Sequence, residues 1–105
     1  MTGLVITFIS RELQKSEYDW ATICFNDTSV GKSRCLINGY EFTIFSINVY
    51  PEYQGKGYGK AFVDEAKKKY RKITADRVRS TAIGFWESVG FRKDGETENW
   101  VYTRA

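Results

Sequence analysis

The chain has 105 residues and a mass of 12.1 kDa, a length that predicts a single domain spanning residues 1–105. Apolar residues make up 42% of the chain and aromatic residues 16%, so we expect a packed core rather than disorder. The absence of histidine excludes catalysis by a histidine base and metal sites built on histidine ligands. No stretch is apolar enough to span a bilayer, and the start of the chain does not resemble a signal peptide, so the sequence predicts a cytoplasmic protein without a membrane partner.

The net charge is +3, and the run at residues 67–72 (KKKYRK) carries five positive charges. This basic run favours either a solvent-exposed helix end or a docking surface, and nucleic acid is the less favoured partner. Cys24 and Cys35 lack the spacing of metal ligands, so we expect no metal site. They are predicted to be free thiols that face each other across a hairpin turning near Ser29 and Val30.

The first half of the chain has the patterns of four strands joined by turns, at residues 3–9, 18–26, 33–37 and 40–50. The polar residues 10–17 form either a loop or one helical turn. Turn-forming residues occupy 26–32 and the pair Asn38-Gly39. The fourth strand is apolar on both faces, as central strands are, and Pro51 ends it because proline cannot continue a central ladder.

The second half alternates between helices and strands. Its predicted elements are a helix at 60–71, a strand at 73–78, a helix at 81–89, and strands at 91–93 and 97–104. Ser80 is predicted to cap the second helix and Gly90 to end it, while Asp94-Gly95 forms the last hairpin turn. This order predicts an α/β fold with a sheet of mixed direction.

The segment between the central strand and the first helix, at 52–59 (EYQGKGYG), contains alternating glycines at Gly55, Gly57 and Gly59. Glycine permits positive φ and close approach of a ligand, and backbone amides at a helix start favour an anion. With Lys56 and Lys60 beside it, the segment indicates a site for a pyrophosphate, whereas a single glycine would indicate only a flexible turn. The spacing differs from those of the dinucleotide-binding and P-loop motifs.

Two ordered motifs resemble a known family. The stretch Gln54-Gly55-Lys56-Gly57-Tyr58-Gly59 resembles the Gln/Arg-x-x-Gly-x-Gly/Ala motif of the GNAT superfamily of acyl-CoA-dependent N-acetyltransferases. The later stretch 82–91 (AIGFWESVGF) is similar to that superfamily's Ala-x-x-Phe-Tyr-x-x-x-Gly-Phe segment. The resemblance covers residues 40–92 and implies a mixed, mostly antiparallel central sheet splayed around an acyl-CoA cleft, with two main helices.

The resemblance also implies where acyl-CoA binds. The central strand would pair with the pantetheine arm, the glycine-rich segment would hold the pyrophosphate, and the second helix would line the other side of the thioester. The residues that it assigns to acyl-CoA are Ile47, Asn48, Val49, Gln54, Gly55, Lys56, Gly57, Tyr58, Gly59, Lys60 and Trp86.

The implied reaction is transfer of an acetyl group from acetyl-CoA, as co-substrate, to an amine by direct attack and without a metal. Such a reaction needs proximity, a polarised carbonyl and a proton acceptor, and Glu41 is the candidate catalytic base. Residues 10–17 are too few for the two helices that shape the family's acceptor site, which favours a protein or peptide amine over a small metabolite.

Two further departures from the family pattern leave alternatives open. Trp86 stands where tyrosine is frequent, and an indole N–H cannot protonate the leaving thiolate. Arg79 stands where asparagine is common. The alternative function is therefore a non-catalytic acyl-CoA-binding sensor or regulatory subunit. A homodimer through an exposed edge strand near the carboxyl terminus is a further expectation.

Overall fold

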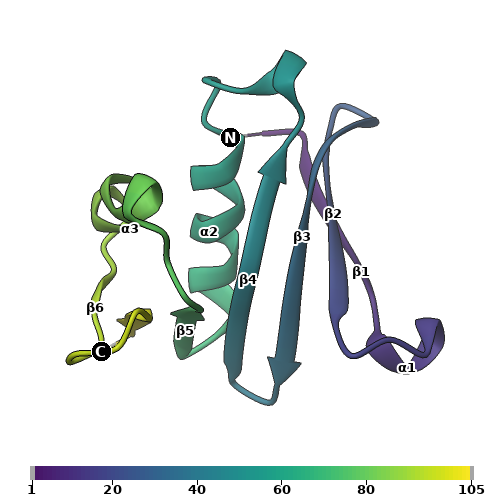
Figure 1. The fold of residues 1–105 in the computed structure, drawn as a ribbon. Coiled ribbons are helices and arrows are strands. Elements are labelled where there is room, and N and C mark those ends of the chain that lie inside the picture. Colours follow the sequence, from purple (N-terminus) through teal and green to yellow (C-terminus); the bar gives the residue numbers. More distant parts are fainter. Residues whose placement is uncertain (1, 105) are drawn as a thin grey trace.

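The computed structural model describes residues 2–104, in which one seven-stranded sheet is the largest feature. All neighbouring strands are antiparallel except β4 and β5, which are parallel. The predicted mixed, mostly antiparallel sheet is therefore confirmed. In their order across the sheet (Figure 1) the strands are β1 (Leu4–Ile9), β2 (Asp19–Phe25), β3 (Thr28–Asn38), β4 (Glu41–Val49), β5 (Lys72–Ala75), β7 (Trp100–Thr103) and β6 (Arg92–Lys93).

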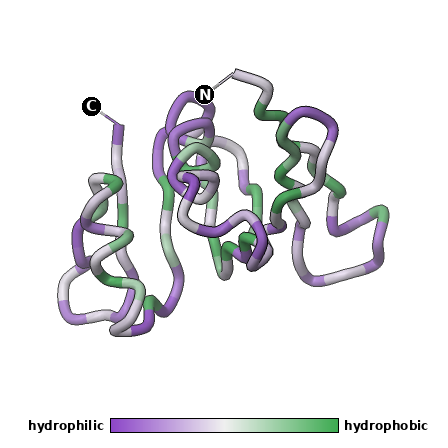
Figure 2. Tube along the Cα trace, turned by 90° about the horizontal axis from the view of Figure 1, so that it is seen from above, coloured by the Kyte–Doolittle hydropathy of each residue, from purple (hydrophilic) through white to green (hydrophobic). Residues whose placement is uncertain are grey.

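The helices differ greatly in length. The longest is α2 (Tyr58–Lys69), followed by α3 (Ile83–Ser88) and the single turn α1 (Arg11–Gln14). Seen from above (Figure 2), the carboxyl-terminal segment with α3 and the amino-terminal strands lie on opposite sides of α2. Within residues 2–104, no helix combines the length and the apolar character that crossing a membrane requires. The carboxyl-terminal edge strand β6 has only two residues, and dimerisation through it stays a prediction.

An aromatic cluster fixes α2 on the sheet. Phe42 of β4 is 1% exposed, and its ring stacks on that of Tyr70 with centroids 4.7 Å apart and an interplanar angle of 6°. The rings of Phe62 of α2 and Phe8 of β1 meet the Phe42 ring edge-on, with centroid distances of 6.3 Å and 6.1 Å. Burial of such large rings is the main source of stability in a small domain. The cluster therefore holds the start and the end of α2 in a fixed relation to β4.

The sheet splits beyond the middle of β4. β3 accompanies β4 along almost its whole length, but β5 pairs only with residues 41–44 and its last partner pair is Ile44 with Ala75. The β3–β4 register shifts at this point, which leaves Phe45 as an extra residue in β4. Such a bulge bends a strand and increases its twist. Residues 45–49 therefore have a strand partner on the β3 side and none on the β5 side within residues 2–104.

The hairpin between β2 and β3 differs from the prediction. Its turn is Asn26-Asp27, with φ of 49° and 66°, and β3 starts at Thr28 rather than at residue 33. Positive φ at both positions matches two-residue turns that follow the twist of the strands. Residues 28–32, which the sequence predicts to be part of the turn, belong to β3 because β4 lies close beside this strand. A Cβ on Gly31 would come within 2.6 Å of the backbone oxygen of Asn48.

The earlier turn also changes the placement of the two cysteines. Cys24 lies opposite Ser29, whereas Cys35 lies opposite Asp19, so the predicted face-to-face arrangement is wrong. Both thiols are free, with Cys24 half-buried and Cys35 fully buried. Burial, and to a smaller extent the negative charge of Asp19, raises the pKa of Cys35 to about 12.

The second helix also starts differently from the prediction. Ser80 begins a 3-10 turn (Ser80–Ala82), and α3 follows at Ile83 without any side-chain cap, so the capping role of Ser80 is wrong. The 3-10 turn takes up the first turn of the expected helix, which leaves the Ser80 hydroxyl away from the free amides. Gly90 lies one residue beyond the C-cap and adopts φ of 90°, as predicted for a helix-ending glycine.

A buried carboxylate ties the amino-terminal half together. Asp19 is 3% exposed and accepts three hydrogen bonds. Two come from Arg11, from its backbone N–H at 2.7 Å and its guanidinium at 3.0 Å, and one comes from the backbone N–H of Ile37 at 2.8 Å. Since these partners belong to α1 and β3, Asp19 joins both elements to β2.

We predict that Asp19→Ala lowers the free energy of unfolding by about 3 kcal/mol, because it leaves a partly buried guanidinium and two backbone donors without their acceptor. Urea denaturation followed by circular dichroism measures the loss. Asp19→Asn keeps an acceptor oxygen and is expected to lose less. The exposed Glu12→Ala provides the surface baseline, and an Asp19→Ala loss no larger than this baseline would contradict the prediction.

Alkylation with iodoacetamide at pH 9 is expected to modify Cys24 and to spare Cys35. The raised pKa keeps the Cys35 thiol protonated at this pH, and only a thiolate reacts rapidly. Peptide mass spectrometry identifies the modified residue. In Cys24→Ser, the remaining thiol should react only after urea is added, and rapid labelling of this folded variant would show that Cys35 is accessible and ionised.

Candidate functional site

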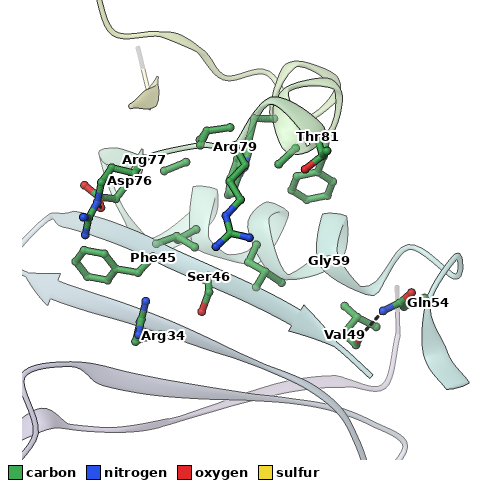
Figure 3. Close-up of a pocket in the computed structure, with 17 residues that line it drawn as sticks. Arg34, Phe45, Ser46, Val49, Gln54, Gly59, Asp76, Arg77, Arg79 and Thr81 are labelled. Atoms are coloured by element: carbon green, nitrogen blue, oxygen red, sulfur yellow. Dashed lines mark hydrogen bonds and ion pairs between the residues drawn. The ribbon is translucent and has the colours of Figure 1, made fainter. Parts of the chain in front are cut away.

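A cleft of about 980 Å³ occupies the split in the sheet (Figure 3). β3 contributes Arg34 to its lining, and β4 contributes residues 44–47 and 49. The opposite wall consists of residues 75–79, which end β5 and follow it, and of α3 with the turn before it. Because β5 does not pair with β4 beyond Ile44, the cleft exposes an unpaired edge of β4 along its length.

The glycine-rich segment forms one end of the cleft. Gln54 and Gly59 both line it, and the residues between them form the turn into α2. Gly55 and Gly57 have φ of 78° and 86°, in the left-handed region that favours glycine, and a Cβ on either would point into open space. The side-chain Nε2 of Gln54 donates to the backbone oxygen of Val49 at 2.9 Å, which fastens this turn to the end of β4 (Figure 3).

The start of α2 presents free backbone donors. Gly57 is its N-cap, and the first intrahelical bond runs from the N–H of Ala61 to the oxygen of Gly57. The N–H groups of residues 58–60 therefore lack intrahelical acceptors, and the helix dipole adds partial positive charge around them. This arrangement can hold an anionic group such as a phosphate.

The predicted acyl-CoA residues fall into two groups. Five of them line the cleft, and six lie outside its lining, mostly in the turn between Gln54 and Gly59. The five are Ile47, Val49, Gln54, Gly59 and Trp86; the six are Asn48, Gly55, Lys56, Gly57, Tyr58 and Lys60.

Two residues of the turn into α2 are already engaged through their side chains. The ring of Tyr58 is buried against Phe25, at a centroid distance of 5.3 Å, so only its backbone amide is available to a ligand. Lys60 forms an ion pair with Asp64 at 2.7 Å, whereas Lys56 is exposed. Lys56 is therefore the freer of the two lysines to meet an anion.

Trp86 belongs to both the core and the cleft wall. It is 7% exposed, and its ring contacts those of Phe85 and Phe91 at centroid distances of 5.1 Å and 4.8 Å. Phe85 also lines the cleft and lies against Gly59, where a Cβ would be 3.5 Å from the Phe85 ring. These contacts set the separation between α3 and the start of α2.

The candidate base Glu41 lies away from the cleft. It is the first residue of β4, its side chain is 61% exposed, and its nearest cation is Lys72 at 4.0 Å. Ser46, which lines the cleft, lies five residues further along the strand, about 16 Å away. Within residues 2–104, Asp76 is the one carboxylate that lines the cleft.

Sequence reasoning did not single out Asp76 and its neighbour Arg77. The Arg77 guanidinium Nε donates to the Asp76 carboxylate at 2.9 Å, which raises the pKa of Arg77 above its ordinary value. Arg77 has φ of 47°, a left-handed conformation that is unusual outside glycine, and its N–H donates to the side-chain oxygen of Asn99 at 2.9 Å. Asn99 thus supports the backbone geometry that brings Asp76 and Arg77 to the cleft. In the sequence, the only signal for these two residues is their position near the end of the predicted strand at 73–78.

The basic run at residues 67–72 lies outside the cleft lining. Its cations have local partners on α2 and on neighbouring elements, which fits the prediction of a solvent-exposed helix end. Lys68 pairs with Glu65 at 3.0 Å and Lys72 with Glu41 at 4.0 Å, while Lys67, Lys69 and Arg71 lie over the rings of Tyr102, Phe8 and Tyr40 respectively.

Removal of the Asn99 acceptor tests this support. We predict that Asn99→Ala lowers the free energy of unfolding by about 1 kcal/mol and accelerates hydrogen exchange at the Arg77 amide, because this N–H loses its acceptor while its backbone stays strained. Asn99→Asp keeps an acceptor oxygen and should keep the amide protected. Equal exchange rates in all three proteins would show that Asn99 does not support Arg77.

The chain matches the acetyltransferase (GNAT) domain family over residues 17–93. It is similar to the uncharacterised N-acetyltransferase OB1458 of Oceanobacillus iheyensis, with 44% identity over 51 residues that make up 49% of this chain and 31% of that protein. It is also similar to the uncharacterised N-acetyltransferase ycf52 of Porphyra purpurea, with 32% identity over 77 residues, 66% of this chain and 44% of that protein. The matches thus span less than half of either relative.

Solved structures share the fold at low sequence identity. YhhK from E. coli, bound to coenzyme A, aligns with a TM-score of 0.71 and 16% identity over 96% of this chain and 98% of that one. The Bacillus subtilis N-acetyltransferase YlbP, in complex with coenzyme A, gives 0.65 and 24% over 90% and 77%. A GNAT family acetyltransferase from Elizabethkingia anophelis with acetyl-CoA bound gives 0.62 and 14% over 99% and 100%. Because the domain match covers most of the chain and the expected fold is present, the chain belongs to the GNAT superfamily of acetyltransferases.

Proposed function

We propose that this protein transfers an acetyl group from acetyl-CoA to an amine. The observation that carries the proposal is the continuity between the unpaired edge of β4 and the start of α2, which meet where Gln54 is bonded to Val49. A ligand would match both parts if it had an extended, amide-bearing segment for the edge of β4 and a diphosphate for the start of α2. Acyl-CoA has this construction.

The pantetheine arm is proposed to lie along residues 45–49 of β4. Its amides would take the place of a missing strand and pair with backbone groups that β5 leaves free. Ile47 and Val49 would contact its apolar part, and Phe85 with Trp86 would close the opposite side. The thioester would then lie beside the bulge at Phe45, at the end of the cleft that is far from the start of α2.

The diphosphate is proposed to bind at the turn into α2. The free amides of residues 58–60 and the two left-handed glycines, Gly55 and Gly57, provide donors that no Cβ obstructs. Lys56 would add a mobile positive charge.

Chemically, the proposed step is direct attack of a neutral amine on the thioester carbonyl. The tetrahedral intermediate collapses as the C–S bond breaks, and the attacking nitrogen releases a proton to water. Coenzyme A leaves as a thiolate that takes up a proton from water. Asp76 is proposed to hold the incoming ammonium, so that its proton passes to the carboxylate or to solvent before the attack. The geometry favours Asp76 over Glu41 for this role, because Glu41 faces Lys72 outside the cleft.

The acceptor is proposed to be the amine of a protein or peptide in preference to a small metabolite. Between β1 and β2 the chain forms only the short helix α1, and no residue of 2–33 lines the cleft. A larger acceptor would itself cover the side that the chain leaves uncovered. Specificity would then depend on contacts made outside the cleft as well as within it.

One observation favours an alternative without turnover. Trp86 lies on the cleft wall where the family frequently has tyrosine, and the indole N–H is a hydrogen-bond donor only. A protein that binds acyl-CoA as a sensor or regulatory subunit would keep the cleft without needing an acid. Formation of acetylated acceptor and free coenzyme A separates catalysis from binding alone.

Substitution of Gly57 tests the diphosphate site. Gly57→Glu and Gly57→Gln carry similar side chains and the same left-handed strain, so they differ mainly in charge. We expect Gly57→Glu to bind acetyl-CoA about tenfold or more weakly than Gly57→Gln, since its carboxylate repels phosphate at close range. Isothermal titration calorimetry measures both affinities. Equal affinities would place the diphosphate elsewhere, and no binding by the unaltered protein would refute the proposed function.

A further inference from the structure

The charges that line the cleft do not balance. Four charged side chains from two walls line it, namely Arg34, Asp76, Arg77 and Arg79. Asp76 and Arg77 form an ion pair at 2.9 Å. The guanidinium groups of Arg34 and Arg79 have no hydrogen bond or ion pair with any residue of 2–104. The cleft thus carries two uncompensated positive charges.

Arg34 is held in place by aromatic contacts rather than by an anion. Its guanidinium carbon lies 4.7 Å from the centroid of the Tyr18 ring, and Tyr18 in turn meets Phe45 edge-on at 5.0 Å. Its Nε is buried and has no hydrogen-bond partner among the described residues. A buried donor without an acceptor is costly, so a bound anion would contribute more here than on an open surface.

The position of Arg34 separates it from the diphosphate site. Arg34 lies opposite Ser46 in the sheet, beside the bulge, whereas the turn into α2 is fastened to Val49. The three residue steps from Ser46 to Val49 on β4 span about 10 Å. Arg34 therefore lies at the end of the cleft where the thioester and the amine would meet, and away from the proposed site of the coenzyme A diphosphate.

Arg79 approaches the same region from the opposite wall. In Figure 3 its side chain extends from the loop after β5 across the cleft toward Ser46 on β4. Arg79 is exposed, and it can therefore adjust its position to a ligand. Arg34 lies on β3 opposite Ser46 and Arg79 extends from beyond β5, so the two arginines line the cleft from different sides of the split in the sheet.

We propose that Arg34, assisted by Arg79, binds a negatively charged group of the acceptor, and that the preferred acceptor is an amine next to a carboxylate or phosphate. This inference rests on the proposed function and specifies its substrate class. The guanidinium can form paired hydrogen bonds with either anion. A polyamine or a lysine-rich segment is disfavoured, because it would bring further positive charge into the cleft. Arg34 acts as a specificity residue and makes no bond to the reacting atoms.

The test uses acceptor peptides that differ at one position. The peptides Ala-Asp-Ala-Gly, Ala-phosphoserine-Ala-Gly, Ala-Asn-Ala-Gly and Ala-Lys-Ala-Gly, each amidated at the carboxyl end and the last with its Lys ε-amine dimethylated, present the same α-amine beside different charges. We expect kcat/KM to be about tenfold or more higher for one or both anionic peptides than for the Asn peptide, and lowest for the Lys peptide. The first two peptides distinguish carboxylate from phosphate recognition.

Arg34→Ala is expected to remove this preference by lowering kcat/KM for the anionic peptides to the level of the Asn peptide, while acetyl-CoA affinity stays unchanged. Arg34→Lys keeps the charge without the planar group and should restore part of the preference. Arg71→Ala, which removes an arginine that lies over Tyr40 outside the cleft, is the matched control. An equal loss with all four peptides in Arg34→Ala would assign Arg34 to the thioester or to folding and would overturn the proposal.

A binding measurement separates this inference from the proposed function. The Nε–H resonance of Arg34 is followed by NMR while the Asp or phosphoserine peptide is added to the protein saturated with coenzyme A. A saturable shift with an anionic peptide, absent with the Asn peptide, supports the inference even when no peptide is acetylated. No shift with either anionic peptide overturns it, whereas failure of acetyl-CoA to bind or to react overturns the proposed function instead.

Discussion

The short parallel pairing of β4 with β5 is the constraint on which the rest of the molecule depends. The two strands are joined through residues 41–44, and the bulge at Phe45 then turns β4 away from the end of β5. The buried hydroxyl of Ser33 donates to the backbone oxygen of Ser46 at 2.7 Å, so the irregular part of β4 remains bonded to β3. A continuous pairing would fill the split, and no cleft would exist between the two halves of the sheet.

Different contacts hold the elements of each half of the sheet together. On one side, the aromatic cluster around Phe42 packs α2 against β4, and Asp19 joins α1, β2 and β3 through charge-assisted hydrogen bonds. On the other, Trp86 and Phe91 pack α3 onto the carboxyl-terminal strands. α2 contacts both halves, because Gly59 near its start lies against Phe85. The position of this helix therefore sets the width of the cleft as well as the location of the free backbone amides at the start of α2.

The electrostatic character of the cleft bears on its chemistry. An amine attacks only when it is neutral, and nearby positive charge lowers the pKa of a bound ammonium. The two uncompensated arginines would therefore disfavour polycationic acceptors, and the positive charge would be neutralised when an acceptor brings its own anion into the cleft.

Strand periodicity and glycine spacing are local properties of the chain, so the sequence was enough to predict the order of the elements and a glycine-dependent turn at Gly55 and Gly57. It also indicated the family, through two motifs of consecutive residues at 54–59 and 82–91. The turn at Asn26-Asp27, the start of α3 and the cleft position of Asp76 depended on tertiary contacts. Gly31 and Lys32 become strand residues because β4 lies against them, and Arg34 and Arg79 line one cleft because β4 and β5 separate beyond Ile44. Such meetings between distant residues leave no periodic signal, so the tertiary structure alone could show the charges that the cleft brings together.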